Sequence, residues 1–100
     1  MVRHIVFWKL KEDAAGGTKE ANAQRVKELL EDLRGKVPGL LRIEVGFDFS
    51  QTAASMDVAL YSEFESREAL DGYQDHPDHV KAKDFIRSVT DARSLVDYEL

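Results

Sequence analysis

The sequence contains no cysteine, so it has no disulfide, no thiolate metal site and no cysteine nucleophile, and its redox compartment stays undetermined. It also lacks an excess of basic residues: 14 lysines and arginines face 19 acidic residues, giving a formal net charge of -5. Because a basic surface supplies affinity for the phosphate backbone, we expect no nucleic-acid partner. No apolar run is long enough to span a bilayer, so we expect a soluble, cytoplasmic protein without a membrane partner.

Several motifs of catalytic and metal-binding sites are also absent from the sequence. The chain has no glycine-rich phosphate-binding loop and no nucleophile elbow, and its carboxylates show no motif for paired acid–base catalysis. His76 and His79 are three residues apart, but no third ligand stands at a recognisable spacing from them. We therefore expect neither a metal nor a cofactor. Pro77 suits the first position of a helix, which would turn His76 outward as a helix-entry residue.

What is present is a balanced globular composition, with 43% hydrophobic and 33% charged residues in 100, which predicts one domain over residues 1–100. Strands are predicted where apolar and polar residues alternate, and helices where apolar residues recur every three or four positions. The predicted elements are a strand at 2–10, a helix from Thr18 to about Arg34, strands at 40–49 and 56–61, a helix capped by Ser66 and ending near Tyr73, a helix beginning at Pro77, and a strand at 94–99.

This order is the split βαβ pattern of ferredoxin-like α+β folds: a four-stranded antiparallel sheet with helices on one face. The first strand is apolar on both sides, which a single layer of helices cannot cover. The face away from the helices would be an exposed apolar patch on a monomer, so we expect it to pack against the same face of a second copy. The residues expected on that homodimer face are Ile5, Phe7, Ala59, Tyr61, Val96 and Tyr98.

Three residues are expected to converge between the helices and the sheet. His79 continues the inward-facing stripe of the last helix, His4 shares its side of the first strand with Val6 and Trp8, and Tyr73 ends the preceding helix. One interpretation is a small cavity walled by Val6 and Trp8, in which a phenol and two imidazoles bind a polar ligand or move a proton. The alternative is that each polar group is a hydrogen-bonded part of the core.

Four segments together resemble the stress-responsive A/B barrel (Dabb) domain family. They are His4–Leu10 (HIVFWKL), Asp57–Ser66 (DVALYSEFES), Tyr73–His79 (YQDHPDH) and Val96–Tyr98 (VDY), spread over essentially the whole chain. The resemblance implies a dimeric α+β barrel, in which two ferredoxin-like protomers join through their sheets. It agrees with the homodimer inferred from the apolar face.

The resemblance implies less about activity. Most members of the family have no assigned reaction, plant members are linked to stress or defence, and one is a polyketide cyclase that closes a ring by intramolecular aldol condensation. The cyclase's catalytic Tyr and His match Tyr73 and His79, and further histidines of its pocket match His4 and His76. The implied roles are a proton-transferring phenol for Tyr73, an activating imidazole for His79, and ligand contacts for His4 and His76.

Two functions therefore stay open. The chain is either a small stress-related Dabb protein that binds a small ligand between helices and sheet, or an enzyme. The enzyme would resemble the aldol cyclase or the cofactor-independent monooxygenases of the wider α+β barrel group, using Tyr73 and His79. The sequence does not decide whether a reaction is catalysed.

Overall fold

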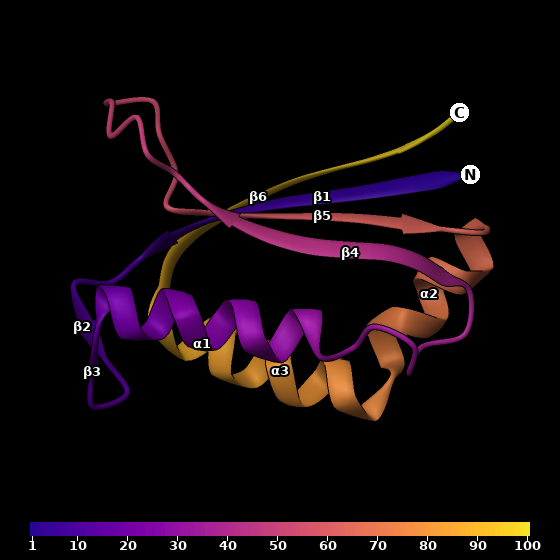
Figure 1. Ribbon diagram of the computed structural model, residues 1–100, viewed down its shortest axis with the longest axis horizontal. Coiled ribbons are helices and arrows are strands. Elements are labelled where there is room, and N and C mark those ends of the chain that lie inside the picture. Colours follow the sequence, from indigo (N-terminus) through magenta and orange to yellow (C-terminus); the bar gives the residue numbers. More distant parts are fainter.

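The computed structural model describes residues 1–100 as one antiparallel sheet with a layer of helices on one face (Figure 1). The sheet order is β4-β5-β1-β6, with every neighbouring pair antiparallel. The elements are β1 (Val2–Leu10), β2 (Asp13–Ala14), β3 (Gly17–Thr18), α1 (Lys19–Glu31), β4 (Leu40–Phe47), β5 (Val58–Phe64), α2 (Arg67–Asp75), α3 (Pro77–Val89) and β6 (Thr90–Glu99). The predicted ferredoxin-like architecture is confirmed.

The helix starts agree with the capping signals in the sequence. The Thr18 hydroxyl accepts from the Ala21 amide at 3.2 Å, and the Ser66 hydroxyl accepts from the Ala69 amide at 3.1 Å. Pro77 occupies the first turn of α3. These side chains satisfy amides that have no partner inside their own helix.

Several boundaries differ from the sequence prediction. α1 ends at Glu31, before Arg34, because the chain then tightens into turns that lead to Gly35 with its positive φ. β5 extends past residue 61 to Phe64, because it pairs with β1 from Val2 to Trp8. β6 begins at Thr90, ahead of residue 94, because it pairs with β1 from Val2 to Leu10. The loop after β1 also contains the short β2–β3 ribbon, which the sequence did not predict.

The two sides of β1 have different environments. Val2, His4, Val6, Trp8 and Leu10 are buried under the helices, as the alternation predicts. Side chains on the other side of the sheet are half-buried or exposed, and no helix covers that face in Figure 1. The helix layer therefore covers one side of the sheet only. No helix is long and apolar enough to cross a membrane.

Gly39 lies immediately before β4 and packs against the first turn of α2. Its φ of +79° lies in the region that favours glycine, and its carbonyl accepts from the Glu65 amide at 2.9 Å. A β-carbon at this position would overlap the β-carbon of Ala69 on α2. The close approach holds α2, which carries Tyr73, against the sheet.

Gly39→Ala should lower the free energy of unfolding by about 2–4 kcal/mol, through the unfavourable φ and the overlap with Ala69. Gly35→Ala is the matched control, because Gly35 has the same φ of +79° with nothing near its absent β-carbon. It should cost only about 1 kcal/mol. Urea unfolding measures both variants. Equal losses would show that α2 does not approach β4 this closely.

Candidate functional site

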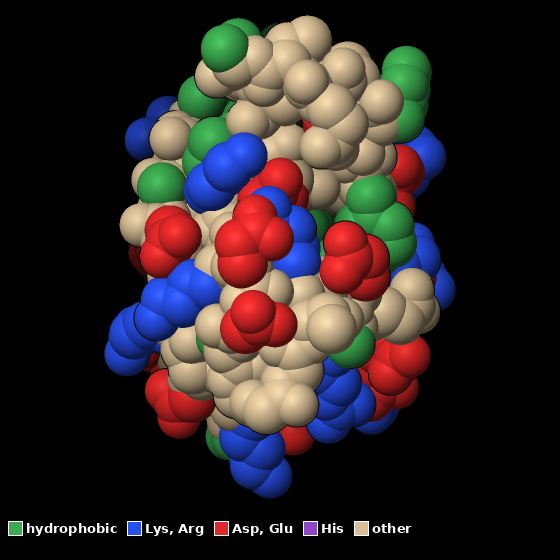
Figure 2. Space-filling view, turned by 90° about the vertical axis from the view of Figure 1, so that its left-hand side faces the viewer, with side chains coloured by type: hydrophobic (Ala, Val, Ile, Leu, Met, Phe, Trp, Pro, Cys, Tyr) green, Lys and Arg blue, Asp and Glu red, His purple; other side chains and the backbone are tan.

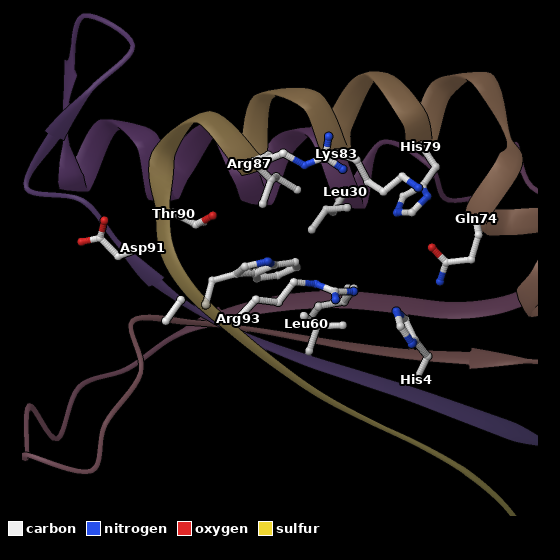
Figure 3. A pocket seen from close by; sticks show the side chains of 14 residues that line it. His4, Leu30, Leu60, Gln74, His79, Lys83, Arg87, Thr90, Asp91 and Arg93 are labelled. Atoms are coloured by element: carbon white, nitrogen blue, oxygen red, sulfur yellow. The ribbon is translucent and has the colours of Figure 1, made fainter.

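A cavity of about 510 Å³ lies between α3 and the sheet, and we call it the helix–sheet cavity (Figure 3). Its lining combines apolar walls with polar groups that come from α2, α3, β1 and β6. The lining residues are His4, Val6, Trp8, Leu30, Leu60, Gln74, His79, Lys83, Ile86, Arg87, Thr90, Asp91, Ala92 and Arg93.

Local periodicity explains how six of these side chains reach the cavity. His79, Lys83 and Arg87 follow one another at four-residue spacing, so they share one face of α3. On β1, His4, Val6 and Trp8 alternate onto the helix-facing side. The face of α3 and the face of β1 thus form two walls of the site, and residues of α1, α2, β5 and β6 complete the lining.

His4 is held by two other strands. Its side chain is buried, and its Nδ1 pairs with the Asp97 carboxylate of β6, which lies directly opposite His4 in the strand register. The His4 carbonyl also accepts from the fully buried Ser62 hydroxyl of β5 at 2.9 Å. These contacts fix the orientation of the imidazole at the floor of the cavity.

Tyr73 and His79 stack on each other. Their ring centroids are 3.8 Å apart with an interplanar angle of 27°, and the Tyr73 ring meets His4 edge-on at 6.0 Å. The Tyr73 hydroxyl and His79 Nδ1 are both buried without a hydrogen-bond partner in the protein, so no hydrogen bond joins the two residues. A stacked pair of this kind is different from a phenol activated by a hydrogen-bonded imidazole.

Burial keeps both rings neutral near pH 7. It raises the pKa of the Tyr73 phenol well above its usual range, and the positive charge of Arg93 opposes this only weakly. Burial, followed by the positive charge of Lys83, lowers the pKa of His79 to about 4, and the nearby backbone carbonyls of Gln74 and Tyr73 offset only part of the shift. His79 is therefore available as a proton acceptor at neutral pH.

The predicted site residues fall into three groups. His4, Val6, Trp8 and His79 line the cavity together. Tyr73 is fully buried behind His79 and does not line it. His76 lies outside the cavity, where its Nδ1 accepts from the Asp78 amide at 3.2 Å and caps α3.

Sequence reasoning missed six polar lining residues: Gln74, Lys83, Arg87, Thr90, Asp91 and Arg93. The four-residue spacing from His79 could have identified Lys83 and Arg87. Arg93 could not be found in this way, because the prediction began the last strand at residue 94. No three histidine, aspartate or glutamate side chains form a group that could hold a metal ion.

The comparisons with known proteins agree with the fold. A dimeric protein of unknown function from Bacteroides fragilis is 34% identical over 99% of this chain and 95% of its own, with a TM-score of 0.87. A dimeric ferredoxin-like protein of unknown function from Thermobifida fusca is 26% identical over 99% of this chain and 90% of its own, with a TM-score of 0.83.

An enzyme also shares the fold. Hydroxynitrile lyase from Passiflora edulis is 20% identical over 97% of this chain and 90% of its own, with a TM-score of 0.77. No curated protein matches the chain. The sequence profile of the Stress Responsive A/B Barrel Domain (Dabb) matches residues 2–100, and the chain belongs to that family.

Proposed function

We propose that the protein binds a small organic molecule in the helix–sheet cavity. The observation that carries the proposal is a cavity of about 510 Å³ with apolar walls, into which a neutral imidazole and an amide are directed. This is the usual composition of a small-molecule site, and the volume suits a ligand of one or two rings. The family's description supports a stress-related role for that binding.

The polar groups give the cavity its selectivity. In Figure 3, the Gln74 side chain extends from the end of α2 into the space between His79 and His4. His79 Nδ1 is buried and forms no hydrogen bond of good geometry, although the carbonyls of Gln74 and Tyr73 lie nearby, and such a group costs stability unless something hydrogen-bonds to it. A ligand with a donor or acceptor near these residues would offset that cost.

Thr90→Trp should abolish ligand binding, because Thr90 points into the cavity and an indole there would fill part of it. Ser88→Trp is the matched control, since Ser88 is exposed on α3 and does not line the cavity. Binding of a library of one- and two-ring fragments is followed by amide chemical shifts at His4, Gln74 and Lys83. The proposal fails if fragments shift other parts of the protein, or if Thr90→Trp binds them as wild type does.

A second candidate is an enzyme in which His79 accepts a proton from the bound molecule. The position of His79 favours it, because the ring lines the cavity and its pKa of about 4 leaves it neutral, though weakly basic, at pH 7. An aldol cyclisation or a cofactor-independent oxygenation would use His79 and Tyr73. Tyr73 could act only if its ring left the stacked position, because its hydroxyl does not reach the cavity lining.

His79 should titrate near pH 4 in the folded protein. Because its folded pKa lies below the unfolded value of about 6.5, the folded state favours the neutral ring, and stability is lost as pH falls from about 6.5 to about 4. The loss attributable to this ring is about 3 kcal/mol, and His79→Gln should lack it. NMR titration of the imidazole and urea unfolding across this range provide the two measurements. A midpoint near 6.5 would remove the basis for a buried neutral base.

We also infer a homodimer formed through the sheet face that the helices leave uncovered, with Ile5, Phe7, Tyr61 and Tyr98 in the interface. Val96 and Tyr98 are 54% and 40% exposed on that face. A hollow of about 520 Å³ beside Phe7, Phe47 and Phe49 continues the apolar surface toward the β4–β5 loop. The description of the two bacterial relatives as dimeric supports this assembly.

Phe7→Glu should convert the dimer to a monomer, because it would bury an unpaired carboxylate between the two sheets. Val80→Glu places the same charge at an exposed apolar residue on α3 and should leave the dimer intact. Sedimentation velocity measures the association state of both variants. A stable Phe7→Glu dimer would place the interface elsewhere.

A further inference from the structure

Three basic side chains surround the helix–sheet cavity, and we call them the cavity cations: Lys83, Arg87 and Arg93. In Figure 3, Lys83 and Arg87 extend from α3 on one side, and Arg93 reaches from β6 into the space opposite them. Lys83 is half-buried, whereas the two arginines are exposed. The cavity thus has positive charge on both its helix side and its strand side.

The cavity cations differ from most other basic residues of the chain in having no partner. None of them forms an ion pair or a side-chain hydrogen bond. Elsewhere Lys27 pairs with Glu31 at 2.7 Å, and Lys36 pairs with Asp32 at 2.8 Å. Figure 2 likewise shows acidic and basic side chains interspersed on one end of the molecule.

The excess of positive charge at the cavity is opposite in sign to the net charge of the whole chain. The protein has a net charge of -5, so acidic partners are in excess. Within the cavity lining, however, only Asp91 carries a carboxylate, and in Figure 3 it lies at the end of the cavity away from His4 and His79. Low-dielectric walls strengthen the field of unpaired charges at a cavity. That field attracts an anion.

Two of the cavity cations also affect the pKa values of the buried rings. Lys83 contributes to the lowered pKa of His79, and Arg93 acts on the phenol of Tyr73 in the direction opposite to burial. Lys83 and Arg93 line the same cavity as His79. An anion bound between them would meet favourable charge without leaving the apolar walls.

We propose that the ligand of the cavity is an organic carboxylate with an apolar body, an inference that rests on the proposed binding function. The carboxylate lies among the cavity cations, and Arg93 offers a planar guanidinium that can donate two parallel hydrogen bonds to it. The apolar body packs against Trp8, Leu60 and Ile86.

A singly charged carboxylate suits this cavity better than a phosphate ester. The lining provides no glycine-rich loop to hold a phosphate through backbone amides, since it contains no glycine at all. Asp91 would also repel a dianion more strongly than a monoanion. The apolar walls favour a ligand whose charge is confined to one end.

Two probes of the same size, one charged and one neutral, provide the test: 3-phenylpropanoate and 3-phenylpropanamide, titrated into the protein and followed by NMR. The acid should bind about fivefold more tightly than the amide, and the difference should shrink as salt is added. Arg93→Gln or Lys83→Gln should weaken binding of the acid far more than binding of the amide and so remove most of the preference. Lys81→Gln, on the exposed side of α3 and outside the lining, should keep the preference.

The outcomes separate this inference from the proposed function. If acid and amide bind the cavity equally, or if Arg93→Gln weakens both equally, the cavity binds small molecules but does not select carboxylates, and the inference is overturned. If neither probe nor any fragment enters the cavity, the proposed binding function fails and the inference fails with it. A salt-sensitive preference for the acid that Arg93→Gln removes, and Lys81→Gln does not, supports it.

Discussion

The pairing of β6 with β1 is the constraint on which the candidate site depends. The register sets Asp97 opposite His4 and Arg93 opposite Trp8, so both charged residues fall on the helix-facing side. A shift of one residue would turn every β6 side chain to the other face. The His4–Asp97 pair would then be lost, and Arg93 would leave the cavity for the uncovered face of the sheet.

The sequence predicts this architecture well because its signals are local. Alternation in β1, the caps Thr18 and Ser66, and Pro77 in α3 each identify an element without knowledge of the rest of the fold. The same local phase placed His4 and His79 between helices and sheet. It failed for Asp97 and Arg93, because their positions depend on the register of two strands that are far apart in the sequence.

The geometry of the buried rings could not be read from the sequence either. The short step from the end of one helix to the start of the next predicts that Tyr73 and His79 are neighbours, but whether their rings stack or hydrogen-bond depends on side-chain packing. In the structure they stack, which leaves the phenol and Nδ1 of the imidazole without partners in the protein. Burying two such groups costs stability, and proteins tend to retain this kind of cost at functional sites.

The cavity itself follows from the abrupt join between α3 and β6. The helix ends at Val89 and the strand begins at Thr90, so the chain reverses without a connecting loop, and the Val89 carbonyl accepts from the Lys11 amide at 2.9 Å. Because β6 leaves directly from beneath the helix end, Arg87 and Arg93 face the same space from two elements. The join that opens the cavity thus brings two basic side chains from different elements to its lining.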